Sequence, residues 1–396
     1  MSACTTLPWG LRGDAHARWA PHSPPARCPP ARRGQATTAA DAAAKAGAKP
    51  HPFALVEPEL QCIAERMRRV LLTEVPQLHA AATHFVADPS ALGKLMRPSV
   101  VMLMSSALSA EGGPAPAHLA VDLSPPSAPV SDPRRRQQRI AEITEMIHVA
   151  TLMHDDVLDE AATRRGKPSV NAALGNKVAI LGGDFLLARA SISLASLGDP
   201  DVMSMLATVL EHLVAGEVMQ ADAREGDLVD LGYYSRKTFL KTASLVAHAC
   251  KAAAKVGGHG EATRDLAYRY GEQLGLAFQI VDDVLDFTQS SGTLGKPALN
   301  DLRSGLATAP VLLALPRHPE LAAMARRRFR GPGDVEAAEA AVRGSGGIEA
   351  AREMAARHAR AAAECVRGLP PPASAGAEEA RAALVEATET VLTRVS

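Results

Sequence analysis

The chain has 396 residues, of which 47% are hydrophobic and 22% charged, and its 43 basic and 43 acidic side chains give a formal net charge of zero. This composition is typical of a globular protein, and a zero net charge excludes an overall electrostatic field that would attract nucleic acid or a membrane surface. The cysteines have no paired spacing, which argues against a disulfide framework or a zinc knuckle. No run approaches the roughly 20 uninterrupted apolar residues of a membrane-spanning helix, so we expect none.

The first fifty residues differ in composition from the rest. They are rich in Ala, Pro, Ser and Thr and carry seven basic residues against only Asp14 and Asp41. A basic, hydroxyl-rich and acid-poor N-terminus is typical of an organellar transit peptide, and the apolar core of a secretory signal is missing. We therefore predict a transit peptide or disordered leader over residues 1–50. The expected location is an organelle, with the mitochondrion preferred and the plastid as the alternative.

From about Pro52 onward, the sequence predicts helix almost throughout. Residues 112–136, rich in Pro, Ser and Ala, predict a long surface loop, and 292–301 a second irregular stretch. Strand patterns are scarce and no linker separates two halves, so we predict one all-α domain over 51–396, a large helical bundle around a central cavity. Apolar residues recur at helical spacing in 55–73, 98–108, 139–160, 176–197, 201–222, 235–256, 262–288, 306–315, 347–366 and 377–395.

The pentapeptide Asp-Asp-Val-Leu-Asp occurs twice, at 155–159 and 282–286, each time inside an apolar helix-forming stretch. On a helix, the first two carboxylates of each copy lie beside the third, and like charges at that spacing destabilise the helix. Either copy alone is compatible with a solvated acidic surface. Two identical copies instead predict two helices that face each other across one cavity and bind a hard cation, because ligands that are all oxygen favour magnesium over zinc or copper. The predicted metal ligands are Asp155, Asp156, Asp159, Asp282, Asp283 and Asp286.

Basic and polar side chains surround both copies. Lys94 and Arg97 lie one turn apart at the start of a predicted helix, and His148 lies two turns before Asp155, about 10 Å along the axis. Cationic side chains next to carboxylates that bind metal ions are typical of a site for phosphorylated substrates. The remaining members of this set are Arg164, Arg165, Lys241, Thr242, Gln279 and Lys296.

These regions resemble those of the trans-isoprenyl (polyprenyl) diphosphate synthases. Residues 143–148, 154–159 and 164–166 are similar to the first Asp-rich region of that family and 278–287 to its second, and the resemblance covers about 52–396. It implies an all-α prenyltransferase that condenses isopentenyl diphosphate with an allylic diphosphate primer. It further implies a cofactor of about three Mg²⁺ ions per active site. Such enzymes usually pair, so a homodimer or a heteromer is expected, and no nucleic-acid partner.

The resemblance also implies a role for each matching residue. The binders of isopentenyl diphosphate would be Lys94, Arg97, His148 and Arg165. The contacts to the allylic diphosphate would be Arg164, Lys241, Thr242, Gln279 and Lys296. Ionisation of the allylic carbon–oxygen bond would depend on magnesium and on Asp155, Asp156, Asp159, Arg164, Lys241, Asp282 and Asp283. No protein base stands out, so the departing diphosphate is expected to take the proton.

Two departures from the family pattern bear on the product. Leu95 stands where the family often has an arginine. Leu306 stands where many short-chain members have a lysine. The sequence Leu-Ala-Thr at 306–308 resembles instead the long-chain synthases that make quinone side chains. One turn before Asp155, Ala150 and Thr151 are small, which would leave a tunnel open for the growing tail. Thr144 and Ile147 lie further back on the same helix. We predict a long-chain product of the solanesyl type, for ubiquinone or plastoquinone; the alternative is that these residues only pack closely.

Two other functions are compatible with an Asp-rich helix. A terpene cyclase normally mixes Asn, Ser or Thr with Glu in its second metal site and has an aromatic pocket that stabilises cations. Here the second copy is all carboxylate, and aromatic residues make up only 3% of the chain. A non-catalytic subunit that retunes an active synthase would be expected to lose carboxylates, and none is lost.

Overall fold

The computed structural model describes residues 51–84, 95–164, 166–288 and 299–394. The predicted transit peptide and three predicted substrate-binding residues, Lys94, Arg165 and Lys296, lie outside these ranges.

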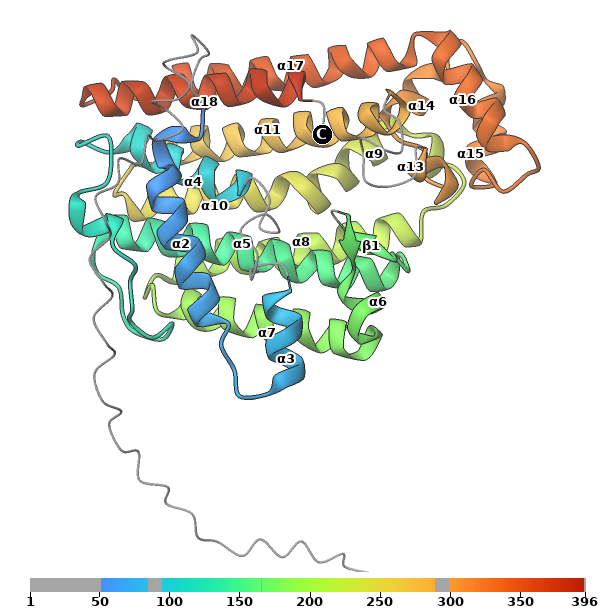
Figure 1. Ribbon diagram of the computed structural model, residues 1–396. Helices are drawn as coiled ribbons and strands as arrows, with labels where there is room; N and C mark the ends of the chain where they lie inside the picture. Colours follow the sequence, from blue (N-terminus) through green and yellow to red (C-terminus); the bar gives the residue numbers. More distant parts are fainter. Residues whose placement is uncertain (1–50, 85–94, 165, 289–298, 395–396) are drawn as a thin grey trace, which may run out of the picture. The chain divides into compact units, whose positions relative to one another are not determined.

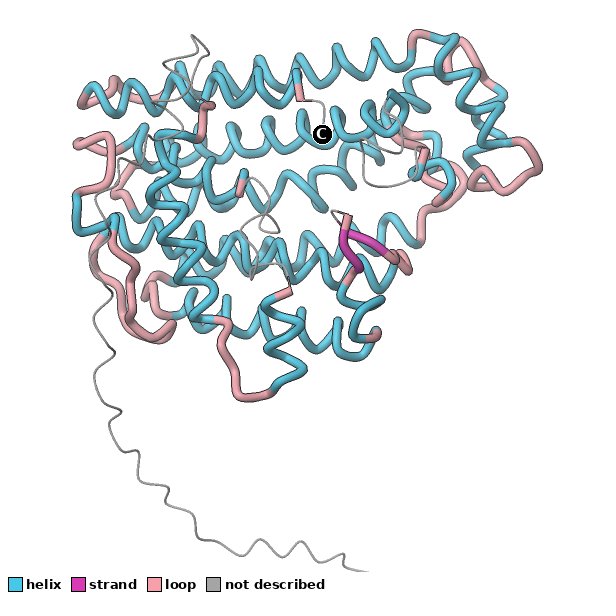
Figure 2. The backbone as a smooth tube through the Cα atoms, viewed as in Figure 1, coloured by secondary structure: helices cyan, strands magenta, loops and turns pink. Residues whose placement is uncertain are grey.

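Helices form almost all of the described structure, and within it a short hairpin, β1 (Thr163–Arg164) and β2 (Lys167–Pro168), provides the only strands (Figure 2). The predicted all-α class is therefore confirmed. The α-helices are α2 (Glu57–Val70), α3 (Pro76–Thr83), α4 (Met96–Leu108), α5 (Pro133–Leu158), α6 (Val170–Leu174), α7 (Asn176–Ala195), α8 (Pro200–Ala221), α9 (Leu231–Thr238), α10 (Ser244–Val256), α11 (Glu261–Thr288), α13 (Asn300–Arg303), α14 (Ala309–Ala314), α15 (Glu320–Arg326), α16 (Asp334–Ser345), α17 (Gly347–Arg367) and α18 (Ala375–Thr393). A π-helical turn, η4 (Phe239–Ala243), joins α9 to α10, and the 3-10 turns are η1 (Ala54–Val56), η2 (Pro116–Leu119) and η3 (Asp227–Val229).

Helix α10 lies at the centre of the bundle, because nearly all of its residues are small or apolar and it can be buried on every side. It packs against α4, α5, α8 and α11, while α11 packs on its other side against α17 (Figure 1). Two glycines of α11 allow the close approach. A Cβ atom at Gly271 would lie 2.7 Å from Cα of Ala247, and one at Gly275 would lie 2.5 Å from Cα of Ala243. This contact brings η4 directly against α11.

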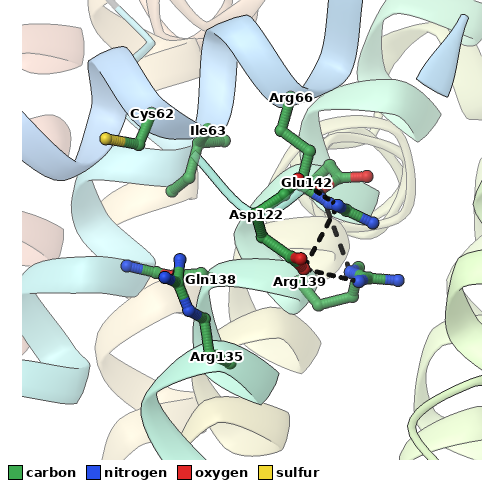
Figure 3. A pocket seen from close by; sticks show the side chains of 8 residues that line it. All are labelled: Cys62, Ile63, Arg66, Asp122, Arg135, Gln138, Arg139 and Glu142. Carbon is green, nitrogen blue, oxygen red and sulfur yellow. Dashed lines mark hydrogen bonds and ion pairs between the residues drawn. The ribbon is translucent and has the colours of Figure 1, made fainter. Parts of the chain in front are cut away.

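Helix α5, which ends in the first Asp-rich copy, is anchored by a buried ion-pair network (Figure 3). Nε of Arg66 on α2 lies 2.8 Å from Oε2 of Glu142 on α5, and Asp122 of the preceding loop contacts both Arg66 and Arg139 at 3.1 Å. Arg66 also donates to two carbonyls of this loop, those of Asp122 and Ser124. The network therefore fastens α2 and the loop to the middle of α5.

The segment predicted as a loop, 112–136, contains the 3-10 turn η2, and α5 already begins at Pro133. The side chain of Asp132 caps the helix by accepting a hydrogen bond from the backbone N–H of Arg135, at 2.7 Å. Arg134, predicted as loop, is buried and paired with Glu59. The predicted helices correspond to observed ones, while the sequence patterns missed α3, α6, α13, α15, α16 and the β1–β2 hairpin.

By length and composition alone, helices α7 and α8 are long and apolar enough to cross a membrane. Of the most apolar 18-residue stretch, 33% is buried in α7 and 22% in α8. Neither helix is an uninterrupted apolar run, because charged residues such as Asp184 in α7 and Glu211 in α8 interrupt them. The absence of a membrane-spanning helix thus stays a prediction. We call their exposed large apolar residues the α7–α8 face: Ile180, Leu181, Ile192, Met203, Val214 and Val218.

Candidate active site

The first Asp-rich copy forms the C-terminal end of α5, with Asp159 as the residue that caps the helix. This is the negative end of the helix dipole, where carboxylates are disfavoured unless a cation is near. Burial raises the pKa of Asp155 to about 6, opposed by the nearby charge of Lys241. Burial also raises the pKa of Asp159, and Lys241 opposes this shift as well. Asp155 is half-buried and Asp159 exposed, and Lys241 is the cation whose charge acts most strongly on both carboxylates.

The middle carboxylate of this copy, Asp156, has a different role in the structure. It is fully buried, and its Oδ1 accepts hydrogen bonds from Nε and Nη2 of Arg164 at 2.9 and 2.5 Å. Arg164 lies on β1, so this ion pair ties the hairpin to the end of α5. Asn171 of α6 donates to the backbone carbonyl of Asp156 at 3.0 Å. Asp156 thereby shapes the end of α5 from inside the protein.

The second copy lies on α11, and two of its carboxylates are likewise bound by the protein. Oδ2 of Asp283 accepts from the hydroxyl of Tyr234 at 2.5 Å and Oδ1 from Gln279 at 3.0 Å, and burial raises the pKa of Asp283. Asp286 accepts from the backbone N–H groups of Asn300 and Asp301, both at 3.1 Å. These bonds fix α9 and α13 against α11.

The first carboxylate of the second copy, Asp282, is exposed and contacts the end of the last helix. Arg394, which caps α18, places Nη2 2.5 Å from Oδ1 of Asp282 and its guanidinium carbon 3.8 Å from the centre of the Phe278 ring. The guanidinium also donates to the carbonyl of Phe278 at 3.1 Å. The C-terminal helix therefore takes part in the second Asp-rich region.

Two lysines connect the surroundings of the two copies. Lys237 and Lys241 are four residues apart, in α9 and η4, and their charges repel. Lys241 forms an ion pair with Glu217 of α8. Its charge favours the ionised forms of Asp155 and Asp159 and so opposes the rise in their pKa. The charge of Lys237 opposes the rise in the pKa of Asp283 in the same way. The charges of these two lysines thus act on carboxylates of both Asp-rich copies.

The π-helical turn η4 places the two polar residues of this segment, because Lys241 and Thr242 both lie in it. Such turns are rare and occur frequently at functional sites. The hydroxyl of Thr242 donates to Oε1 of Gln279 at 3.0 Å, and Gln279 in turn donates to Asp283. The predicted residues Thr242, Gln279 and Asp283 are therefore brought together in one hydrogen-bonded chain.

Within the ranges that the structure describes, no three Asp, Glu, His or Cys side chains converge closely enough to hold a metal ion by themselves. Asp156, Asp283 and Asp286 accept hydrogen bonds from protein groups, and Asp282 pairs with Arg394. Asp155 and Asp159 interact chiefly with Lys241, and Asp282 is exposed, so Arg394 would have to move aside for Asp282 to bind a metal ion. The six-carboxylate cage thus stays a prediction, and the geometry favours these three as ligands.

The other predicted residues lie along α4 and α5. Arg97 lies in the first turn of α4 and His148 on α5, both half-buried. The predicted chain-length residues Ile147 and Ala150, together with Thr144, are buried in α5. Thr151 is half-buried, and its hydroxyl donates to the carbonyl of His148 at 2.8 Å.

Comparisons with known proteins identify the family of the chain. Residues 75–342 match the family model described as polyprenyl synthetase. The chain belongs to this family. It is 46% identical over 343 residues to solanesyl-diphosphate synthase 1, mitochondrial, of Oryza sativa subsp. japonica, covering 87% of this chain and 78% of that protein. It is 43% identical, over 87% of this chain and 80% of the relative, to solanesyl diphosphate synthase 3, chloroplastic/mitochondrial, of Arabidopsis thaliana.

Solved structures give the same result. A polyprenyl synthase from Caulobacter crescentus, crystallised with calcium and isoprenyl diphosphate, has a TM-score of 0.72 and 30% identity, covering 87% of this chain and 97% of that one. A medium/long-chain prenyl pyrophosphate synthase from Arabidopsis has a TM-score of 0.69 and 38% identity, covering 87% and 100%. The chain is therefore a prenyltransferase, and its function is that of a long-chain polyprenyl diphosphate synthase. A terpene cyclase is thereby excluded.

Sequence reasoning missed several residues that this polyprenyl synthetase places around the site. Tyr234 and Lys237 precede Lys241 by seven and four residues, so their helical spacing was a usable signal. Glu217, Asp301 and Arg394 are remote in sequence, and only the fold brings them to the two Asp-rich copies.

Proposed function

We propose that this polyprenyl synthetase condenses isopentenyl diphosphate onto an allylic diphosphate primer between α5 and α11, and that its product is of the solanesyl type. The observation that carries the proposal is the arrangement of two identical Asp-rich copies around Lys237 and Lys241. An acidic site with internal cations suits a ligand that brings its own negative charge together with divalent metal ions.

The carboxylates that remain available fit Mg²⁺, because they offer only hard oxygen ligands. Asp155 and Asp159 would hold it from α5 and Asp282 from α11, with diphosphate oxygens completing the coordination; about three ions, as the resemblance implies, is the number we propose. When bound, Mg²⁺ neutralises negative charge that develops on a leaving diphosphate. The complex of the Caulobacter crescentus polyprenyl synthase with calcium and isoprenyl diphosphate supports the proposal that a divalent cation and a diphosphate bind together.

The side chains would divide the work between the two substrates. Lys241 and Arg164 stabilise the charge on the allylic diphosphate, with Thr242 and Gln279 orienting it and Lys296 adding a further cation. Isopentenyl diphosphate is held by Arg97 and His148, together with Lys94 and Arg165. Correct orientation and exclusion of water then favour attack by its double bond over quenching by water, and the departing diphosphate accepts the proton.

The length of the product would depend on α5. Ala150 is small and buried one turn before the Asp-rich end of α5, with Ile147 and Thr144 further back. Small side chains at Ala150 and Thr151 leave room for a growing tail. The long-chain names of the rice and Arabidopsis relatives support a solanesyl product for this chain.

The α7–α8 face supports pairing with a second chain. Exposed apolar patches rimmed by polar residues mark interaction sites, and this face carries large apolar residues on both helices. We propose a homodimer through this face, with a heteromer as the alternative. The organellar names of the relatives, together with the basic N-terminus, support an organellar location, with the mitochondrion preferred.

The test is an assay of the purified chain alone with Mg²⁺, isopentenyl diphosphate and either farnesyl or geranylgeranyl diphosphate. Dephosphorylated products are separated by chain length on reversed-phase thin layers. We expect one long-chain product that disappears with EDTA and returns with Mg²⁺. A short-chain product would overturn the solanesyl assignment, and no product without an added second subunit would favour the heteromer.

A further inference from the structure

Lys237 has a setting that the roles assigned so far do not explain. It lies in the last turn of α9 and lines a cavity of about 30 Å³ together with Tyr233 and Tyr234 of the same helix. Its ammonium group lies 5.7 Å from the centre of the Tyr234 ring. Burial lowers the pKa of Lys237, and the carboxylates around it oppose this shift.

The charged groups that act on Lys237 come from four other elements, α8, α11, α13 and η4. Asp283 of α11, Asp301 of α13 and Glu217 of α8 attract it, and Lys241 repels it. Two of these carboxylates already have closer partners, because Glu217 pairs with Lys241 and Asp283 accepts from Tyr234 and Gln279. The positive charge of Lys237 is therefore attracted by these carboxylates, while Glu217 and Asp283 make their direct contacts with other side chains.

The remainder of the described cavity wall is mostly apolar and carries one carboxylate, that of Asp227. Leu306, Ala307 and Leu312 line the cavity, and of its described lining residues Lys237 alone is basic. With leucine at 306, that wall offers no positive charge. Lys237 and Lys241 lie one turn apart, so a single anion could contact both.

We propose that Lys237 is a further ligand of the allylic diphosphate, supplying from α9 a positive charge that the apolar wall at Leu306 does not supply. This inference rests on the proposed function. In the competing interpretation, Lys237 is only a counter-charge for Asp283 and never contacts substrate.

Substitutions distinguish the two interpretations. A charge-assisted hydrogen bond contributes about 1.5–3 kcal/mol, so Lys237→Met should raise the KM for farnesyl diphosphate by about tenfold or more. The KM for isopentenyl diphosphate should stay within about twofold. Lys237→Arg should retain most of the affinity. In Lys237→Met/Leu306→Lys, a lysine on the other wall of the same cavity should recover part of it. The matched control is Lys255→Met, because Lys255 pairs with Asp201 at 2.7 Å, away from this cavity.

Binding of inorganic pyrophosphate with Mg²⁺, measured by calorimetry and by the shift in melting temperature, separates this inference from the proposed function. We expect pyrophosphate to bind more weakly to Lys237→Met than to the native chain. Without ligand, the melting temperature of Lys237→Met should at least equal that of the native chain, because a partly dehydrated charge is removed. Unchanged pyrophosphate binding and unchanged KM, or a loss of stability alone, would overturn the inference. A native chain that binds pyrophosphate but forms no prenyl product would instead contradict the proposed function.

Discussion

Identical residues in the two Asp-rich copies experience different surroundings, and this decides what each can do. The middle carboxylate is buried in both copies, where Arg164 holds Asp156 and Tyr234 holds Asp283. The first carboxylate is more accessible in each case, since Asp155 on α5 is half-buried and Asp282 on α11 is exposed beside Arg394. Desolvation disfavours the charged form of Asp155, so in the protein without metal this residue stores an unfavourable interaction that a cation would relieve.

The raised pKa of Asp155 gives a pH prediction for the metal-free protein. The folded pKa of about 6 exceeds the ordinary value of 3.8, so the folded state binds the proton more tightly than the unfolded state does. The resulting stability is fully present below about pH 4, is lost as the pH rises to about 6, and changes little above. Melting temperatures of the native chain and Asp155→Asn in EDTA, measured across this range, should therefore diverge in favour of Asp155→Asn as the pH rises. Parallel curves would contradict the assigned burial of Asp155.

Residue roles could be predicted from sequence only where they depend on local spacing. The two Asp-rich copies, and His148 two helical turns before Asp155, could be predicted from such spacing. The partners of the buried aspartates could not, because Tyr234 and Asp283 are 49 residues apart and Arg394 and Asp282 are 112 apart. Such pairs arise from helix packing, which no single stretch of sequence encodes.

At the scale of elements, the position of the first Asp-rich copy depends on how α5 is anchored. Glu142 is buried between Arg66 and Arg139, and the loop before α5 is tied to the same network. Burial raises the pKa of Glu142, and the two arginines oppose this shift. The charges compensate one another only while all are present.

Glu142→Ala should lower the free energy of unfolding by about 3 kcal/mol, because removing one member leaves buried arginine charge uncompensated. Denaturant unfolding measures the loss. Glu353→Ala provides the control, since Glu353 and Arg360 form an exposed pair whose removal should leave the midpoint unchanged. Equal effects of the two substitutions would show that the buried network does not anchor α5.

Helix α5 also carries the residues proposed to control product length. Ala150→Phe and Thr151→Phe introduce a bulky ring one turn before Asp155, and each should shorten the product to a few isoprene units. Ala150 is fully buried, so Ala150→Phe could also impair folding; Thr151 is half-buried and tolerates a ring more easily. Products are compared by chromatography at equal amounts of folded protein. A full-length product from soluble Thr151→Phe would refute the tunnel assignment.

At the scale of the whole molecule, the exposed apolar surface of α7 and α8 predicts a dimer. Val214→Glu and Val218→Glu each place a charge on the α7–α8 face, where both side chains are more than half exposed. Light scattering after size exclusion should give a dimer for the native chain and a monomer for Val214→Glu/Val218→Glu. Glu211→Gln on the same helix, which leaves the apolar residues in place, should remain dimeric. A native monomer would contradict the prediction.

The all-α class followed from helical periodicity because long amphipathic helices show their pattern locally. Short elements such as α6 and the β1–β2 hairpin were missed, since they depend on contacts with the end of α5, including the bond from Asn171 to Asp156. The π-helical turn η4 was also not predicted; it lies where α10 and η4 pack closely against Gly271 and Gly275 of α11, a contact between segments that are separate in sequence.

The central claim is that both Asp-rich copies bind one shared diphosphate through divalent cations. Calorimetric titration of inorganic pyrophosphate into the native chain, Asp155→Asn and Asp282→Asn tests it directly, with the exposed Asp184→Asn on α7 as the control. We predict binding that requires Mg²⁺, that is lost or strongly weakened in either Asp-rich variant, and that is retained in the control. If one of the two variants bound pyrophosphate as tightly as the native chain, the two copies would not share a ligand.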